Sequence, residues 1–412
     1  MTRALRIVNV GLLLLLVGCS SLAPLLSTPT PVPASTATAT PQATPTPTAP
    51  VVDQSRLLRI WLPPQFDPNA ETPSAQLLKQ RLLEFENEHP GLEIEVRIKT
   101  TTDITGALSI TSNAAPSAMP DLIALSYADM QMAASAGFLH PLEGLTDILQ
   151  EPDWYAFARE LGHFQNTEYG LPFASDALLM VYRPAVFDDP LSSWDFIINS
   201  GNQIVFPASD LQASFPLALY LSLKKESSID EETLTRVLTL YQQALTTETI
   251  SPTIRDLQTA EQSLQIFRDG GADLAVGWAS SDIGAQSGEY LPLLGLDNMN
   301  YSLGTGWVWS LAGSGAENEP LAAELASYLV ESDFMSAWTQ ASGYLPTRPQ
   351  ALGSWTNETL RVSLDEILQS THPVPVDDGI RILRPLLQEA LIRIFNGEQP
   401  EVVARSVMES VK

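Results

Sequence analysis

Short apolar strands alternate with amphipathic helices from residue 58 onward, and this alternation restricts the fold more than any other feature. Residues 58–62 form an apolar run that ends at Pro63-Pro64, as a strand would. Residues 92–98 alternate apolar and charged side chains with a period of two, which predicts a half-buried strand. Residues 121–125 are nearly all apolar, which is typical of a parallel strand covered on both faces. The pattern predicts an open, mainly parallel α/β sheet.

The first helix has a defined start and one apolar face. Thr72-Pro73 supplies a capping residue followed by proline at the first helical position, and Leu78, Leu82 and Phe85 recur at helical spacing. His89-Pro90-Gly91 predicts its end. The same reasoning predicts a helix at residues 128–136, a strand at 203–206 and a helix at 231–245.

The N-terminus has the pattern of a secretory signal. Arg3 and Arg6 precede an apolar run at residues 7–17, shorter than the roughly 18 to 20 residues that a membrane-spanning helix needs. Leu16-Val17-Gly18-Cys19 resembles the lipobox of bacterial lipoproteins, which implies removal of residues 1–18 and acylation of the Cys19 sulfur. The alternative is an incidental cysteine in an uncleaved signal. Cys19 is the only cysteine of the sequence, so no thiol remains for a disulfide.

Thr, Pro and Ala dominate residues 27–52. Proline removes amide donors and favours extended, polyproline-like backbone, so such a segment cannot build a core. We therefore expect residues 19–53 to form a lipid-anchored tether. The roughly 360 residues that follow are enough for two domains with large apolar cores.

The chain is strongly acidic, with a formal net charge of −26. Removal of residues 1–18 deletes Arg3 and Arg6 and makes the charge more negative still. Nucleic acid is therefore excluded as a partner, because its binding requires a basic surface. The acidity is best interpreted as an aid to the solubility of an exported protein.

Several motifs occur in a fixed order along the chain. They are residues 85–96, 120–123 with 136–142, 169–183, 267–278, Gly343-Tyr344-Leu345-Pro346-Thr347-Arg348 and residues 395–403. Together they resemble the extracellular solute-binding proteins of bacterial ABC importers, the class that includes maltose-binding protein. Each motif is weak alone, but their common order extends over residues 57–411.

The resemblance implies a two-lobe periplasmic-binding-protein-like fold of type II, in which each lobe is a mainly parallel sheet flanked by helices. Lobe one would hold residues 54–175 and 300–343, and lobe two residues 176–299 and 344–412. The chain would cross between the lobes near Ser175, within residues 292–299 and within residues 343–348.

The candidate ligand-binding residues follow from this fold, because ligands of open α/β sheets bind beyond the carboxyl ends of the strands. That rule places residues 63–67, Ser126-Tyr127, Asp176 and Trp278 at the cleft. Pro63-Pro64 departs from the polar first loop usual in the family. The full set of candidates is Gln65, Phe66, Ser126, Tyr127, Asp176, Trp278, Trp307 and Tyr344.

Aromatic rings can cover the apolar faces of a sugar, so the tryptophans are informative. Trp61 lies within the first strand, which favours the core, whereas Trp278 ends an apolar strand, which favours the cleft. Trp307 and Trp309 share one face of an extended segment, so both should pack or both should reach the ligand. For Asp176, a ligand contact and a structural role at the hinge both fit the sequence.

The sequence indicates no catalytic group, cofactor or metal site. The four histidines are scattered without a second ligand at metal spacing. Gly304-Thr305-Gly306 lacks the lysine of a phosphate loop, and Gly313-Ser314-Gly315 lacks the spacing of a hydrolase elbow. Paired carboxylates such as Asp188-Asp189 and Asp377-Asp378 are explained by chance in so acidic a chain.

The sequence therefore predicts a monomeric, extracytoplasmic receptor, anchored to the cell membrane through lipidated Cys19. The receptor would deliver a small solute, preferably a carbohydrate, to the permease subunits of an ABC importer. The alternative is a surface lipoprotein that uses the same fold for sensing or scaffolding and not for transport.

Replacing Cys19 with Ala should abolish incorporation of a radiolabelled fatty acid, because the sequence holds no other thiol. The unsubstituted chain, labelled in the same cells, provides the reference. Acyl chains on the Cys19→Ala protein would show that the lipobox interpretation is wrong.

A truncated chain that begins at Val52 should unfold cooperatively and bind ligand as the longer mature chain does, because the Thr/Pro/Ala segment contributes no core. Thermal unfolding of the two chains side by side measures this. Loss of the cooperative transition would contradict the assignment of residues 19–53 as a tether.

Overall fold

Strand β1 (Arg56–Leu62) lies between two parallel neighbours. It pairs with β2 (Leu92–Ile98) along its whole length and with β3 (Leu122–Ser126) at Ile60 and Trp61. Helix α1 (Pro73–Glu88) connects β1 to β2. The predicted order of strand, helix and strand is therefore confirmed.

The computed structural model describes residues 56–411 except 188–190, 225, 227 and 314–316. The predicted signal, Cys19, the tether, the Asp188-Asp189 pair, and Ser314 and Gly315 of the Gly313-Ser314-Gly315 segment lie outside the described residues. In the part of the chain that the structure describes, no helix combines the length and the apolar character needed to cross a membrane.

Two long strands join the halves of the sheet. Strand β6 (Leu171–Tyr182) pairs with β10 (Ser302–Leu311) over its first part, and over its second part with β8 (Leu274–Trp278) and β9 (Glu289–Pro292). The strand order is β2-β1-β3-β10-β6-β8-β7, with β7 at Ile204–Val205. The pairings of β6 and β10 along this order are antiparallel, whereas β2-β1-β3 and β7-β8 are parallel.

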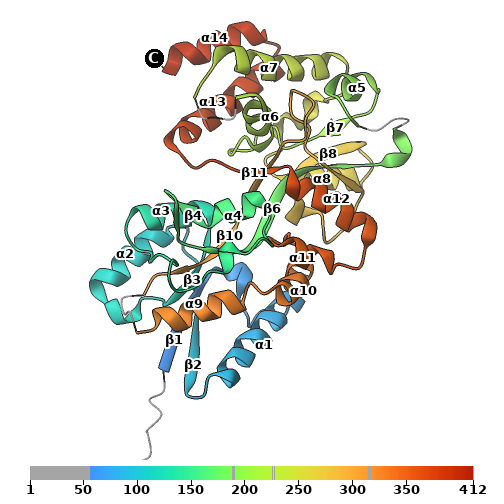
Figure 1. Cartoon of the computed structure of the whole chain (residues 1–412). Coiled ribbons are helices and arrows are strands. Elements are labelled where there is room, and N and C mark those ends of the chain that lie inside the picture. The colour runs from blue at the N-terminus through green and yellow to red at the C-terminus, as the bar shows by residue number, and fades with distance from the viewer. Residues whose placement is uncertain (1–55, 188–190, 225, 227, 314–316, 412) are drawn as a thin grey trace, which may run out of the picture. The chain divides into compact units, whose positions relative to one another are not determined.

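Helices surround each half of the sheet (Figure 1). We call the half with β1, β2 and β3 lobe one and the half with β7, β8 and β9 lobe two. Lobe one holds α1, α2 (Ile104–Ala114), α3 (Tyr127–Ser135), α4 (Ala156–Leu161), α9 (Glu319–Tyr328) and α10 (Ser332–Ser342). Lobe two holds α5 (Trp194–Asn199), α6 (Ser214–Lys224), α7 (Glu231–Thr246), α8 (Ala260–Arg268), α12 (Glu358–Gln369), α13 (Asp378–Phe395) and α14 (Pro400–Val411).

Shorter elements complete the chain. Helix α11 (Pro349–Gly353) packs against α10 and α12. Strands β4 (His163–Phe164) and β5 (Thr167–Glu168) form a separate pair, and β11 (Thr371–Pro373) pairs with the start of β10.

The local signals of the sequence agree with the structure. The Thr72 hydroxyl accepts a hydrogen bond from the Ala75 N–H at 3.2 Å and so caps α1. The predicted apolar faces are buried: Leu78, Leu82 and Phe85 in α1, and Leu234, Leu238 and Tyr241 in α7. Trp61 is 1% exposed, so its predicted place in the core is confirmed.

Gly304 and Gly306 allow β10 to lie close to its neighbours. A Cβ atom at Gly306 would lie 2.6 Å from the Ala174 carbonyl oxygen on β6, and one at Gly304 would overlap the Thr371 methyl group on β11. Larger side chains would push the strands apart at both positions. The Gly304-Thr305-Gly306 segment therefore has a packing role at the junction of the lobes.

Candidate functional site

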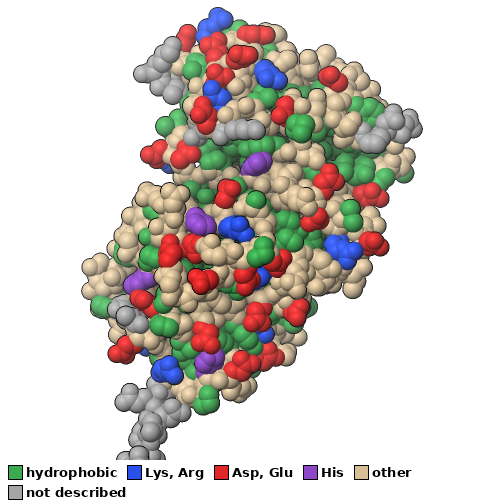
Figure 2. Space-filling view, in the orientation of Figure 1, with side chains coloured by type: hydrophobic (Ala, Val, Ile, Leu, Met, Phe, Trp, Pro, Cys, Tyr) green, Lys and Arg blue, Asp and Glu red, His purple; other side chains and the backbone are tan. Residues whose placement is uncertain are grey.

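A cavity of about 230 Å³ lies between the lobes. Lobe one contributes residues at the start of α3, lobe two contributes residues of α6, β8 and α13, and β10 forms part of the wall. The lining residues of this interlobe cavity are Tyr127, Ala128, Gln212, Ser214, Leu217, Trp278, Leu303, Thr305, Val374, Val376 and Arg384. The structure thus brings together Tyr127 and Trp278, two of the residues predicted from sequence. Figure 2 shows apolar side chains gathered in the band between the two halves of the molecule.

Tyr127 reaches the cavity from lobe one. It directly follows β3, and the Ser126 hydroxyl accepts a hydrogen bond from the Asp129 N–H at 3.2 Å, which fixes the first turn of α3. The ring is half-buried, and this burial raises the pKa of the hydroxyl above its usual value. Among the described residues the Tyr127 hydroxyl has no hydrogen-bond partner, so it remains available to a ligand. Ser126 itself has a capping role.

Trp278 reaches the cavity from lobe two as the last residue of β8. Its ring is half-buried. The short helical turn Ala279–Ser281 follows, and Ser280 is bound to Asp176 on β6. The Asp176 carboxylate accepts hydrogen bonds from the Ser280 N–H at 3.0 Å and from its hydroxyl at 2.5 Å. Asp176 therefore holds the turn that positions Trp278.

Asp176 lies within the hinge and not on the cavity wall. Its side chain is buried, and desolvation raises the pKa of the carboxyl group to about 6, although the bonds from Ser280 partly oppose the rise. Tyr344 lies near this carboxylate, which contributes to the raised pKa of the Tyr344 hydroxyl after desolvation. These contacts favour the structural interpretation of Asp176 that the sequence left open.

A second cavity, of about 260 Å³, lies beside the first loop of lobe one. Gln65 and Trp307 line it together with Lys99 and Asp129. Gln65 is exposed, so its amide is free to reach a solute. Two further candidates from the sequence therefore lie at a cavity, although at a different one from Tyr127 and Trp278.

The remaining candidates form an aromatic cluster behind this loop. The buried Phe66 ring contacts Trp307, Tyr344 and Phe173 with centroid distances of 5.0, 5.8 and 5.4 Å. Phe173 in turn stacks on Trp309 at 4.5 Å. Phe66 and Tyr344 thus support the loop, and neither belongs to the lining of the two cavities described above.

Trp307 and Trp309 share one face of β10, as expected, but their exposure differs. Trp309 is 2% exposed, whereas Trp307 is half-buried and reaches the second cavity. Trp307 pairs with Ser126 at the carboxyl end of β3, and Trp309 pairs with Ala124 deeper in the sheet. Both rings therefore pack on the aromatic cluster, and Trp307 alone of the two also lines the second cavity.

Sequence reasoning did not identify the polar residues that lobe two supplies. Arg384 on α13 and Gln212 before α6 line the interlobe cavity, and the Arg384 guanidinium donates a hydrogen bond to the Gln212 side-chain oxygen at 2.6 Å. Both positions follow from the packing of distant helices, so no local motif marks them.

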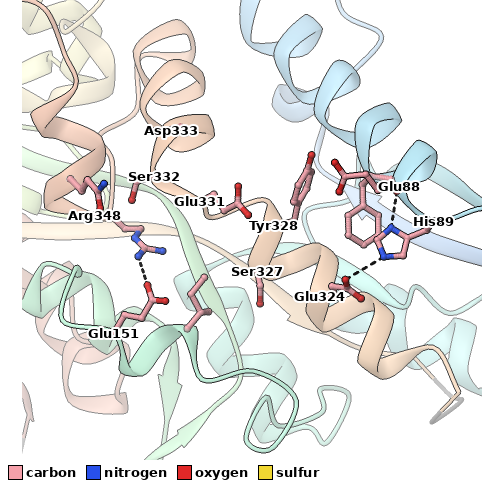
Figure 3. A pocket seen from close by; sticks show the side chains of 13 residues that line it. Glu88, His89, Glu151, Glu324, Ser327, Tyr328, Glu331, Ser332, Asp333 and Arg348 are labelled. Carbon is pink, nitrogen blue, oxygen red and sulfur yellow. Dashed lines mark hydrogen bonds and ion pairs between the residues drawn. The ribbon is translucent and has the colours of Figure 1, made fainter.

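A larger groove of about 510 Å³ lies on lobe one, away from the interlobe cavity (Figure 3). It runs between the end of α1 and helices α9 and α10. Its acidic side chains are largely engaged within the protein: Glu324 pairs with His89, and Glu151 pairs with Arg348. Size alone does not make this groove the site, because it lies away from the carboxyl ends of the parallel strands.

Among the described residues, no group of three or more His, Cys, Asp or Glu side chains is arranged to hold a metal ion. The lining of the interlobe cavity instead combines aliphatic side chains and two aromatic rings with hydroxyl groups, an amide and a guanidinium. Such a wall can cover an apolar face and meet hydroxyl groups without reacting with them.

Comparison with known proteins identifies a family for this chain. The family model described as "bacterial extracellular solute-binding protein" matches residues 80–360. Comparison with curated protein sequences gives no match.

Solved structures show the same fold. The sugar-binding protein MalE from Xanthomonas citri is similar with a TM-score of 0.71 at 14% identity, covering 86% of this chain and 96% of that one. Maltose-binding MalE from Listeria monocytogenes gives 0.68 at 13%, covering 86% and 96%. The GacH receptor of Streptomyces glaucescens, whose structures include complexes with acarbose, gives 0.64 at 15%, covering 86% and 97%. The two-lobe α/β fold predicted from the sequence is therefore confirmed.

The stability conferred by Asp176 should depend on pH. Because the folded-state pKa is raised, the folded protein binds more protons than the unfolded chain between about pH 4 and 6, and stability falls as pH rises through this window. The unfolding free energy of the original protein relative to Asp176→Asn should therefore decrease by about 1 to 3 kcal/mol from pH 4 to pH 6.5. Urea unfolding at both pH values measures the difference.

Asp378→Asn, which removes an exposed carboxylate, serves as the control for the loss of one negative charge. For each variant, the quantity compared is the change with pH of the difference in unfolding free energy between the original protein and the variant. If this change is no larger for Asp176→Asn than for Asp378→Asn, the assignment of Asp176 as a buried, destabilised carboxylate is contradicted.

Proposed function

Because this chain belongs to the bacterial extracellular solute-binding proteins, we propose that it captures a carbohydrate outside the cytoplasm and delivers it to an ABC importer. The observation that carries the proposal is the interlobe cavity, where Tyr127 from lobe one faces the same space as Trp278 from lobe two. A ligand that touches both lobes can favour a closed arrangement, whereas a ligand on one lobe cannot.

Carbohydrate is the ligand class that the wall fits best. Trp278 and Tyr127 offer ring surface, and the Tyr127 hydroxyl, Thr305 and Gln212 offer hydrogen bonds. Proteins of the same fold are described as binding sugars, maltose or acarbose, which supports the same class here. The chain would act by binding alone, since among the described lining residues of the cavity none is a carboxylate or histidine that could transfer a proton.

We place the receptor at the membrane surface through acylated Cys19 and the Thr/Pro/Ala tether. The tether raises the local concentration of loaded receptor at the permease subunits of the importer. One chain supplies both walls of the cavity, so a monomer is sufficient for binding.

A thermal-shift screen of neutral and charged sugars, polyamines, amino acids and metal ions tests the ligand class. A ligand at about 100 times its dissociation constant should add about 2.7 kcal/mol of stability. Stabilisation by a sugar supports the proposal, and stabilisation only by a member of another class would overturn it.

Trp278→Ala should weaken binding of the first sugar found in that screen by about 1 to 3 kcal/mol while leaving the unliganded fold largely intact, because a cavity-lining ring is removed. Trp309→Ala is the matched control: its ring lies in the core, so about 3 to 5 kcal/mol of folding stability should be lost. Calorimetric titration and urea unfolding of each variant separate the two effects. Unchanged affinity in Trp278→Ala would remove this ring from the binding site.

A further inference from the structure

The charge of the interlobe cavity is opposite to that of the rest of the protein. The chain has 48 acidic residues against 22 Lys and Arg, yet the charged side chain on the cavity wall is Arg384, and among the described lining residues none is acidic. In Figure 2 acidic side chains are spread over both halves of the molecule. A cationic wall in so acidic a chain requires a specific explanation.

The positive charge of Arg384 is incompletely compensated within the protein. Its hydrogen bond to Gln212 meets a neutral amide, and its Nε atom is buried without a hydrogen-bond partner among the described residues. Desolvation lowers the pKa of the guanidinium. The side chain is half-buried, and partial burial of a charge without an ion-pair partner is costly, so the arrangement is best explained by a negative group that arrives with the ligand.

The negative charge of Asp210 acts on the Arg384 guanidinium and raises its pKa, against the effect of desolvation. Both carboxylate oxygens of Asp210 already accept hydrogen bonds from other groups. One accepts a hydrogen bond from the Gln212 N–H at 2.9 Å, and the other accepts from the N–H and the hydroxyl of Ser214 at 3.0 and 2.6 Å. Asp210 therefore holds the start of α6 and forms no ion pair with Arg384 among the described residues.

We propose, building on the proposed function, that the carbohydrate is a sugar acid whose carboxylate binds Arg384 while its ring packs on Trp278. The planar guanidinium matches a carboxylate through two parallel hydrogen bonds. A single arginine balances the single negative charge of a carboxylate, whereas a phosphate monoester carries about 1.5 to 2 negative charges at neutral pH. A sugar acid therefore fits the wall better than a sugar phosphate.

Pairs of sugars that differ only in the acid group test this assignment. Calorimetric titration of the full chain would compare galacturonate with galactose and glucuronate with glucose, with glucose 6-phosphate as the phosphate probe. At least one uronate should bind about tenfold or more tightly than its neutral partner, and more tightly than the phosphate.

Arg384→Gln should weaken binding of that uronate about ten- to a hundredfold and bring its affinity close to that of the neutral sugar. Arg384→Lys keeps the charge but loses the planar fork, so it should show an intermediate loss. Arg405→Gln removes an equally charged, exposed side chain on α14 and should leave affinity unchanged. If Arg384→Gln does not fold, the Lys variant and the selectivity of the original protein still decide the question.

The outcomes separate this inference from the function on which it rests. Equal or tighter binding of neutral sugars would overturn the sugar-acid assignment and leave the carbohydrate receptor intact. Tighter binding of the phosphate would overturn the carboxylate assignment. Absence of binding by every sugar in the panel would overturn both.

Discussion

The pairing of β6 with β10 at the hinge is the constraint on which the rest of the structure depends. Ser175 pairs with Gly306 on β10, and its N–H and carbonyl also exchange hydrogen bonds with Leu345, each at 2.8 Å. Three segments that are distant in sequence therefore meet at one residue. The adjacent Asp176 then fixes the turn after Trp278. The segments that carry the cavity walls of the two lobes are joined at this junction. Its hydrogen bonds therefore help to determine that Tyr127 and Trp278 face the same cavity.

Much of the fold could be predicted because its signals are local. The cap at Thr72, the period-two strand at 92–98 and the apolar faces of α1 and α7 each need only a short stretch of chain. Trp278 and Tyr127 could also be placed, because Trp278 ends a strand, Tyr127 directly follows one, and the carboxyl end of a strand is a general position for ligands.

Other parts of the site could not be predicted, since they depend on tertiary packing. Arg384 lies inside a helix of eighteen residues, and only the docking of α13 against lobe two turns it toward the cavity. Phe66 shares a loop with Gln65, yet one side chain is buried among rings and the other is exposed. The difference in exposure between Trp307 and Trp309 likewise comes from the position of the sheet edge. The period-two pattern of a strand does not reveal where that edge lies.

The glycines at the junction have a consequence for how such a protein can change over time. At Gly306 the close neighbour on β6 is a backbone carbonyl, an atom that every residue type possesses. The junction therefore depends on Gly304 and Gly306 and on the side chains that pack directly on them, Leu161, Phe157 and Thr371, none of which lines the interlobe cavity. Wall residues such as Arg384 can then be exchanged by mutation while the frame is retained. A lineage built on this junction could adopt a new nutrient by altering a few helix-borne side chains, without first having to rebuild its architecture.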